Sequence, residues 1–360
     1  MRKRHYFLNH RKFAISAFHS FLKETATYDA HSPIRMCEGK IFKIEVALII
    51  ERHPWIGILL LLCISTIWGG TYVVIQKAIY KLTPFAFLTI RFAIGFLILF
   101  VFSLILRQKV WQTTQVLAGA LLGTFLFTGF ALQTFSLLYT TPSNSGFLSS
   151  LTVLMIPIFS FFILRIPMKP ILIVNIAIAL IGLYLIAFYD WSAINIGDLF
   201  ALLCAVAFAL HVVVNNYFLK KTANYFAFVS IQLGTVSFLS FIAVFLFESW
   251  KVFLQKEILY QFEVYGGILY TALFATALAY FVLTYTQKVF TPTLIGLIIA
   301  SEPVFSVTFD LLINNRVLAL TTIIGCILIF ISTLFAIYTN KPETDPPSMN
   351  PSNGKNETSP

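Results

Sequence analysis

Ten apolar stretches follow one another almost without interruption from Trp55 to Tyr338. Each is close to the ~20 residues that a helix needs to cross the hydrocarbon core of a bilayer. The chain is 58% hydrophobic and only 11% charged. The sequence therefore predicts an all-α, multi-pass membrane protein, with spans at residues 55–77, 84–106, 114–138, 142–164, 170–189, 197–219, 225–247, 264–286, 292–313 and 318–338.

Several connections between these stretches are only a handful of residues long. Short turns place consecutive helices in antiparallel hairpins and leave no room for a soluble domain between the first span and the last. The stretches are continuously apolar over twenty residues rather than alternating over ten, which excludes a transmembrane barrel.

The positions of Lys and Arg predict the orientation. With ten spans both ends share a side, and that side carries nineteen basic residues against five on the other, Lys77, Lys81, Lys251, Lys256 and Arg316. Cytoplasmic loops hold the excess of positive charge, so both termini are expected in the cytoplasm. The formal net charge of +10 then reflects topology, and nucleic-acid binding is not predicted, because the basic residues form no cluster suited to a phosphate backbone.

Residues 1–54 form a tail of different composition. Residues 2–23 contain six basic and no acidic residues, with apolar side chains on one helical face. This pattern suits a helix on an anionic membrane surface, or an organellar targeting segment; Met36 is an alternative translation start. Residues 341–360 are rich in Pro, Ser and Asn and are expected to be disordered.

The two halves, residues 55–189 and 190–340, repeat one another. FAFLTIRF at 85–92 matches FAFVSIQL at 226–233, which places Arg91 opposite Gln232. Ile156 and Pro157 face Glu302 and Pro303 in the same way, and Trp68 faces Phe208. Chance similarity between apolar segments is the alternative. Because each half has five spans, the second is expected to be inverted relative to the first, an arrangement typical of transporters whose substrate site lies near the midplane.

These motifs resemble a known family. The run Trp68-Gly69-Gly70-Thr71-Tyr72, the run Leu88-Thr89-Ile90-Arg91-Phe92 and the run Glu302-Pro303-Val304-Phe305, with Pro157, are similar to the two EamA-type repeats of the drug/metabolite transporter superfamily. The resemblance covers roughly residues 55–340. It implies a ten-helix carrier of the inner or plasma membrane that moves small organic solutes, often outward, with both termini cytoplasmic.

The chain also departs from that family pattern. Leu164-Arg165 and Asn314-Asn315 stand where Gly-Glu often ends the fourth and ninth spans. The basic residue expected near the end of the first span falls at Gln76, with Lys77 one place on. One residue rotates a side chain by about 100° on a helix, so Lys77 is a candidate site residue whose direction is in question.

Charged residues inside the spans are the main candidates for function, because burying a charge in lipid is costly. The fork of Arg91 suits a substrate carboxylate or phosphate, or an acidic partner on another helix, whereas its place seven residues into the span also permits snorkelling. Glu302, mid-span before Pro303, suits proton exchange because burial disfavours the charged carboxylate; a structural hydrogen bond to a broken helix is the alternative. Asp310 lies two turns further along much the same face of the helix. It either lines one solute path together with Glu302 or marks the outer mouth of that path.

Uncharged candidates complete the predicted site. His211 can titrate near neutrality, or it can be a packed residue with its hydrogen bonds satisfied. Four aromatic residues lie where they can wall a cavity: Trp68, Tyr72, Tyr280 and Tyr285. Gly119 and Gly123 form a GxxxG pair that favours close packing against an internal helix or a second subunit.

No cofactor, metal site or enzyme is predicted. The four cysteines form no CxxC, HExxH and GxSxG are absent, and only one of six histidines lies within a span. The sequence instead predicts a secondary active transporter of a small organic metabolite or drug-like solute, working by alternating access as a monomer or homodimer in the bilayer, with proton coupling and export as open features. The alternatives are a facilitative exchanger of amino-acid-like or nucleotide-derived solutes and, least favoured, an intramembrane enzyme.

Overall fold

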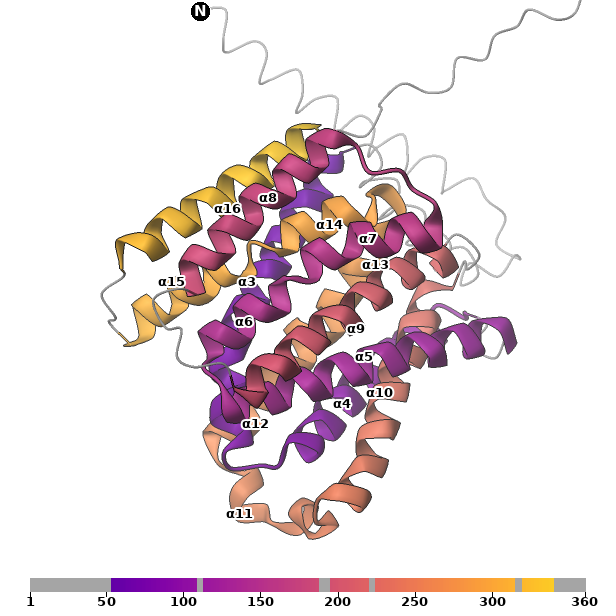
Figure 1. Cartoon of the computed structure of the whole chain (residues 1–360). Coiled ribbons are helices and arrows are strands. Elements are labelled where there is room, and N and C mark those ends of the chain that lie inside the picture. The colour runs from indigo at the N-terminus through magenta and orange to yellow at the C-terminus, as the bar shows by residue number, and fades with distance from the viewer. Residues whose placement is uncertain (1–52, 109–112, 188–194, 220–223, 315–318, 340–360) are drawn as a thin grey trace, which may run out of the picture. The chain divides into compact units, whose positions relative to one another are not determined.

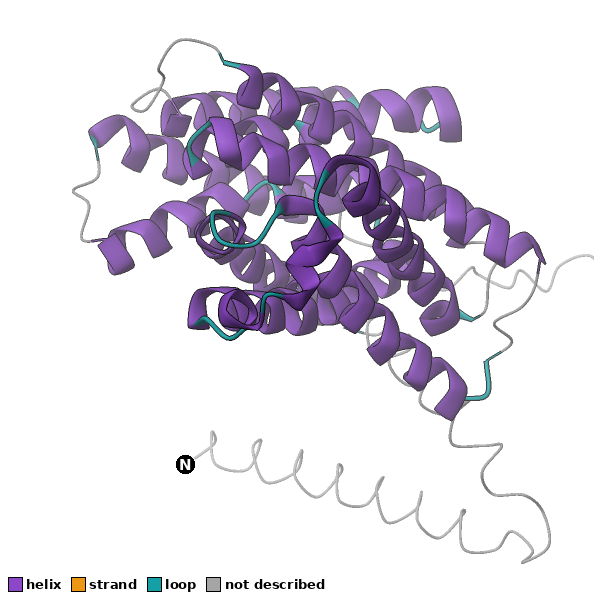
Figure 2. Ribbon diagram, turned by 90° about the horizontal axis from the view of Figure 1, so that it is seen from below, coloured by secondary structure: helices purple, strands orange, loops and turns teal. Residues whose placement is uncertain are grey.

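Long helices joined by short turns make up the computed structural model, which describes residues 53–108, 113–187, 195–219, 224–314 and 319–339 (Figure 1). Among these residues there is no strand (Figure 2). All of them belong to one unit of the chain, Glu45–Pro360. The predictions for the basic amino-terminal tail and the carboxy-terminal tail fall outside the described residues.

Seven of the predicted spans are single α-helices, each beginning and ending within a few residues of its predicted bounds: α3 (Pro54–Ile79), α4 (Pro84–Ile105), α5 (Thr113–Tyr139), α8 (Pro170–Ala187), α9 (Ile196–Leu219), α10 (Tyr225–Phe247) and α16 (Leu320–Thr339). Nine segments of the described chain are long and apolar enough to cross a membrane. Within α8, Pro170–Ile186 is a shorter apolar helix.

The other three predicted spans are interrupted. One divides into α6 (Pro142–Ser150) and α7 (Thr152–Leu164), and another into α14 (Pro292–Ile299) and α15 (Glu302–Asn314). The third runs from α12 (Phe262–Tyr270) through the π-helical segment η3 (Thr271–Leu278) into α13 (Ala279–Val289). Two short helices, η2 (Trp250–Leu254) and α11 (Lys256–Leu259), connect α10 to α12.

The two spans that divide into a pair of α-helices, α6–α7 and α14–α15, begin in the same way. Thr141 precedes α6 and accepts a hydrogen bond from the Asn144 N–H at 3.1 Å; Thr291 precedes α14 and accepts one from the Leu294 N–H at 3.3 Å. A proline follows each threonine as the first helical residue, where its missing N–H costs nothing. The same capping device therefore starts the equivalent helix of each half.

Helices α4 and α10 are antiparallel and are fastened at both ends. At one end, the Glu248 carboxylate accepts from the backbone N–H groups of Phe85 (2.9 Å) and Ala86 (3.2 Å) at the start of α4. At the other end, the Gln108 side chain accepts from the Ala227 N–H at 3.0 Å at the start of α10. Oxygen acceptors satisfy N–H groups that no helical carbonyl reaches, so each helix is capped by the other half of the chain.

Contacts between the halves dominate the packing. Helix α4 packs on α10, α5 on α9, α8 on α16, α3 on α15 and α7 on α9, and Figure 1 shows α8 and α16 side by side. In the order of the spans, α3, α4, α7 and α8 of the first half correspond to α9, α10, α15 and α16 of the second. When each helix is replaced by its counterpart, the pairs α4–α10 and α8–α16 are unchanged and the pair α7–α9 becomes α15–α3. Four of these five helix pairs therefore fit two equivalent halves.

Glycines allow the closest of these approaches. A Cβ atom on Gly123 of α5 would lie 2.5 Å from Cβ of Thr235 and 2.7 Å from the Gln232 carbonyl oxygen, both on α10. The predicted GxxxG face thus meets an internal helix. Gly182 of α8 and Gly325 of α16 approach in the same way, each within 3 Å of the other's carbonyl oxygen if a Cβ were present.

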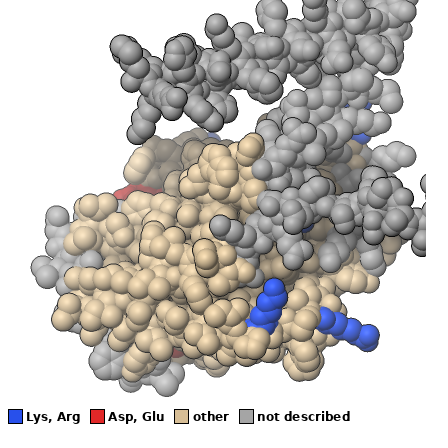
Figure 3. All heavy atoms as spheres, turned by 90° about the horizontal axis from the view of Figure 1, so that it is seen from above, with Lys and Arg blue, Asp and Glu red and all other residues tan. Residues whose placement is uncertain are grey.

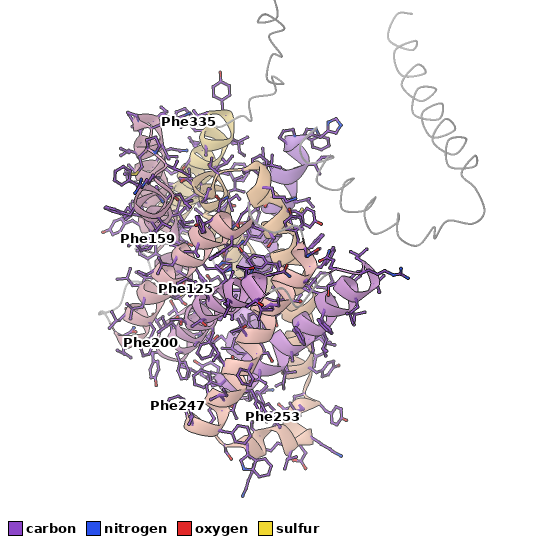
Figure 4. All side chains as sticks on the ribbon, turned by 90° about the vertical axis from the view of Figure 1, so that its right-hand side faces the viewer. Phe125, Phe159, Phe200, Phe247, Phe253 and Phe335 are labelled. Atoms are coloured by element: carbon purple, nitrogen blue, oxygen red, sulfur yellow. The ribbon has the colours of Figure 1, made fainter. Side chains whose placement is uncertain are left out.

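Apolar side chains cover the outside of the bundle. Where the molecule is not covered by undescribed residues, the face in Figure 3 consists almost entirely of uncharged residues, with a few Lys and Arg side chains projecting. Labelled phenylalanines lie along the ribbon from Phe335 to Phe247 and Phe253 in Figure 4. Large exposed hydrophobic residues on α8, α10 and α16 form the kind of surface that lipid solvates.

The α5–α10 approach generates a stability prediction. Gly123→Ala should destabilise the protein by about 1–3 kcal/mol, because overpacking must push the two backbones apart. Gly146→Ala is the matched control, since its Cβ would lie 3.7 Å from Tyr72, an ordinary contact. Thermal unfolding in detergent should show a lower midpoint for the first variant alone, and equal midpoints would contradict the packing.

Candidate functional site

A cavity lies between the two halves of the chain, with about 90 Å³ open to the centres of water-sized molecules. That space is enough for several waters or a small polar group. Residues of both halves line it, from α3, α4, α5, α6, α7, α9, α13, α14 and α15. The polar members of the lining are Trp68, Thr71, Tyr72, Arg91, Gln133, Ser149, Ser150, Thr152, His211, Tyr280 and Glu302.

The wall around Glu302 is built by the contact of α3 with the break between α14 and α15. A Cβ on Gly69 would lie 2.8 Å from the Glu302 carbonyl oxygen, so only glycine permits this approach. One turn earlier, the Ser65 hydroxyl donates to the Ile299 carbonyl at 3.2 Å and pairs with the Ser301 hydroxyl at 3.0 Å. These bonds satisfy backbone groups freed by the break and bring α3 against Glu302.

Glu302 is the first residue of α15 and is partly buried in the cavity wall. The Tyr72 hydroxyl approaches both its carboxyl group and the Ser149 hydroxyl. Gln133 donates to the Tyr72 oxygen at 3.2 Å. This corner therefore joins α3, α5, α6 and α15 around one ionisable group.

Arg91 is only 1% exposed. Its Nε donates to Thr276 Oγ1 at 2.8 Å, and its guanidinium carbon lies 4.9 Å from the ring centroid of Phe130 and 5.1 Å from that of Phe92. One terminal nitrogen, Nη1, is buried without a hydrogen-bond partner among the described residues. The guanidinium is thus held through its Nε and by two aromatic faces. Its Nη1 keeps N–H groups that can donate to a ligand in the cavity.

The π-helical segment η3 supports two of these residues. Its Thr276 accepts from Arg91, and its Ala275 carbonyl accepts from Trp68 Nε1 at 2.9 Å. A π-helix shifts the hydrogen-bond register and frees carbonyl groups for side chains. The irregular segment therefore positions one residue from each of α3 and α4.

His211 is 2% exposed and begins a chain of buried side-chain hydrogen bonds. Its Nε2 lies 2.9 Å from Gln232 Oε1, Gln232 Nε2 donates to Asn215 Oδ1 at 3.2 Å, and Asn215 Nδ2 donates to Gln287 Oε1 at 2.6 Å. The histidine lies in the cavity wall and is packed with a hydrogen-bond partner, the second of the two arrangements considered from the sequence.

Arg91 and Glu302 share the cavity without forming an ion pair. Within the described part of the chain, the one ion pair closer than 4.0 Å joins Lys81 and Glu263, at 3.1 Å and half-exposed. Opposite charges held apart in a place of low dielectric are poised to attract complementary charges strongly. The cavity can therefore receive a solute that carries both an anionic and a cationic group.

The structure brings together six of the nine predicted site residues and leaves the others out. Trp68, Tyr72, Arg91, His211 and Glu302 line the cavity, as does Tyr280. Lys77 does not; it is exposed and lies in a separate groove beside Glu263 and Tyr270, as its one-residue rotation suggests. The side chain of Asp310 lies outside the described part of the structure.

Tyr285 is the other aromatic candidate that does not reach the cavity. It is buried between Tyr225 and Phe281, with ring centroids 5.3 Å and 4.6 Å away. Five residues separate it from Tyr280, which turns it to a different face of the span.

The neutral polar residues of the site were not among the residues predicted from the sequence. Ser149, Ser150 and Thr152 form a run of hydroxyl groups in the middle of an apolar span, and this run was the available signal. Gln133 gave a similar signal in the third span, whereas nothing in the sequence marks Thr276 as the partner of Arg91. No three His, Cys, Asp or Glu side chains come together as a metal site in the described residues.

Comparison with known proteins agrees with this architecture. The sequence profile of the EamA-like transporter family matches residues 55–188 and again residues 195–338. The chain belongs to the EamA-like transporter family. A protein of Archaeoglobus fulgidus named an uncharacterized transporter is 28% identical over 272 residues, which are 75% of this chain and 82% of the relative.

A solved crystal structure of a protein shares the fold. Its TM-score is 0.59 at 19% sequence identity, and the match covers 76% of this chain and 96% of the other. The EamA family and the name of the relative indicate a membrane transporter of the drug/metabolite superfamily, a class that moves solutes and is not enzymatic.

The buried, half-paired guanidinium generates a prediction for this EamA protein. Arg91→Lys keeps the charge but cannot bond Thr276 and a solute anion at once, so we expect at least a roughly tenfold loss of transport, the effect of losing a hydrogen bond to a charged group. Solute flux into proteoliposomes, normalised to protein, measures it. Lys77→Gln is the control and should transport normally; normal flux in Arg91→Lys would restrict Arg91 to a structural role.

Proposed function

We propose that this EamA protein is a secondary active transporter that moves a small zwitterionic organic solute by alternating access. The observation that supports this substrate class is the cavity between the halves, where Arg91 and Glu302 lie without an ion pair. Arg91 would hold a carboxylate or phosphate through its free donors, and Glu302 an ammonium group. Trp68, Tyr72 and Tyr280 would supply apolar and cation–π contacts.

The proposed mechanism uses two inverted repeats of five spans, with α8 and α16 as the last span of each. Three kinds of mirrored feature support it: the Thr-Pro starts of α6 and α14, the reciprocal caps between α4 and α10, and helix pairs that map onto each other when the halves are exchanged. In such a transporter the halves rock about a fixed site and expose it to one side at a time.

We place both termini in the cytoplasm, following the distribution of basic residues. The inner or plasma membrane is the location that membership of the EamA family implies. Reporter fusions test this orientation. A fusion after Pro360 should report the cytoplasm, and one within residues 248–263, which contain η2 and α11, should report the outside. An external carboxy terminus would contradict the inverted arrangement.

Glu302 is the group we propose to couple transport to protons. Of the described residues it is the one acid that lines the cavity, and it forms no ion pair with any of them. It also begins a helix at a break where the backbone is already irregular. Protonation would remove the charge that holds an ammonium group and so link proton binding to solute release. We further propose export as the direction, in keeping with the family's common activity.

The proton-coupling test uses Glu302→Gln, which resembles the protonated carboxyl at nearly constant shape. The variant should still exchange solute across proteoliposomes but should lose accumulation driven by an imposed pH gradient. The solute is first identified by comparing metabolites inside and outside cells that lack or overproduce the protein. Glu248→Gln is the control, because Glu248 caps α4 away from the cavity.

One observation favours a second candidate, facilitative exchange without protons. A carboxylate at the first position of α15 is stabilised by the helix dipole, which suffices as a structural role for Glu302. If the Glu302→Gln variant concentrates solute in response to a pH gradient as the wild type does, exchange without a role for Glu302 in coupling becomes the better description.

A further inference from the structure

Two equivalent hydrogen bonds hold helix pairs together in the two halves. Gln76 Nε2 on α3 donates to the Leu137 carbonyl on α5 at 3.0 Å, and Asn216 Nδ2 on α9 donates to the Gln287 carbonyl on α13 at 3.0 Å. We call them the α3–α5 contact and the α9–α13 contact. Each joins the first span of a half to the third, near the carboxyl end of both helices.

The two contacts lie at opposite ends of the bundle. Thr140, just after α5, donates to Asp198 at the start of α9 at 2.7 Å, so α5 and α9 are antiparallel neighbours. The carboxyl end of α5, with the α3–α5 contact, therefore lies beside the amino end of α9. The α9–α13 contact is near the other end of α9, and both contacts are made at once in this structure.

Among the described residues, a continuous chain of side-chain hydrogen bonds joins the cavity to the α9–α13 contact but not to the α3–α5 contact. The chain from His211 through Gln232 and Asn215 ends on the side chain of Gln287, whose own carbonyl makes the α9–α13 contact. All four side chains are at most 2% exposed. Buried polar groups that bond only one another must move together or lose hydrogen bonds, since water is not there to replace them.

The first half lacks the polar side chains for an equivalent series of hydrogen bonds. Counted from the matching residues Trp68 and Phe208, Ile75 stands at the place of Asn215. Counted back from the Thr-Pro starts of α6 and α14, Leu137 stands at the place of Gln287, and both Ile75 and Leu137 are apolar. Arg91 stands at the place of Gln232 and is bonded to Thr276 instead. The connection is therefore a feature of the second half alone.

We propose that Gln232, Asn215 and Gln287 are positioning residues that couple the cavity wall at His211 to the α9–α13 contact, so that a change in the cavity opens that end and not the other. The proposal rests on the proposed alternating access. A solute that displaces the His211 ring would weaken the chain and then the contact, whereas the α3–α5 contact would respond only to motion of the helices themselves. The two ends of the transport path would then be controlled unequally.

The test measures opening at each end without any solute. Thr134 on α5 and Thr284 on α13 occupy equivalent places one turn before the two contacts, and each is 2% exposed. Cysteine is placed at one or the other in the full chain, with the four native cysteines replaced by alanine, in lipid nanodiscs. The rate of reaction with a water-soluble maleimide reports how often each end opens.

Breaking a contact directly calibrates the assay. Asn216→Ala should raise labelling at position 284 roughly threefold to tenfold, the factor expected for one lost hydrogen bond, and leave position 134 unchanged. Gln76→Ala is the matched variant and should raise labelling at position 134 alone. Thermal unfolding of each variant distinguishes local opening from loss of the fold.

The decisive step is to break the series of hydrogen bonds from His211 to Gln287 without removing the α9–α13 contact itself. His211→Phe and Gln287→Leu leave the Asn216 bond to the Gln287 carbonyl available, yet both should raise labelling at position 284 and not at 134, and His211→Gln should restore the slow rate. If neither variant changes position 284, or if both ends respond equally, the coupling is wrong. Because no transport is measured, this result is independent of whether the proposed solute class is correct.

Discussion

The close approach of α3 to the break between α14 and α15 is the contact on which the site depends. Gly69 lets the backbones meet, and the Ser65 hydroxyl pairs with the Ser301 hydroxyl and donates to the Ile299 carbonyl, a group that the interruption leaves in an apolar medium. The same few residues thus stabilise an irregular backbone and bring the Trp68 and Tyr72 segment of α3 to the cavity wall that holds Glu302. Without this contact the break would not be part of the cavity wall.

The sequence could predict the spans because twenty continuous apolar residues leave a helix few alternatives, and α10 was placed at its observed bounds, Tyr225–Phe247. It indicated the broken helix at Glu302 and Pro303, where α14 gives way to α15, but it could not predict the other two interruptions. The break at Leu151 lies six residues before Pro157, and η3 contains no proline or glycine. Both interruptions are set by tertiary contacts, such as the bond from Trp68 to Ala275, which a local pattern does not contain.

The same difference applies to the site. Charged residues in lipid are costly wherever they occur, so Arg91 and Glu302 could be selected from their type alone. Serine and threonine carry no such signal, because their hydroxyls can bond a carbonyl one turn back in the same helix, as Thr89 does with Phe85. Which hydroxyls face the cavity, and that Thr276 would receive Arg91, depends on how the two halves meet.

Helices α8 and α16, like α10, contribute no described residue to the lining of the cavity. They meet where Gly182 and Gly325 bring the two main chains together with no side chain between them. In a rotation about this contact, atoms near the crossing would move little, whereas atoms at the far side of each half would move much further. Under the alternating access proposed above, this crossing would be the pivot that stays closed while the lining of the cavity rearranges. A bulky residue at either glycine would then shift the axis of that motion as well as the helices.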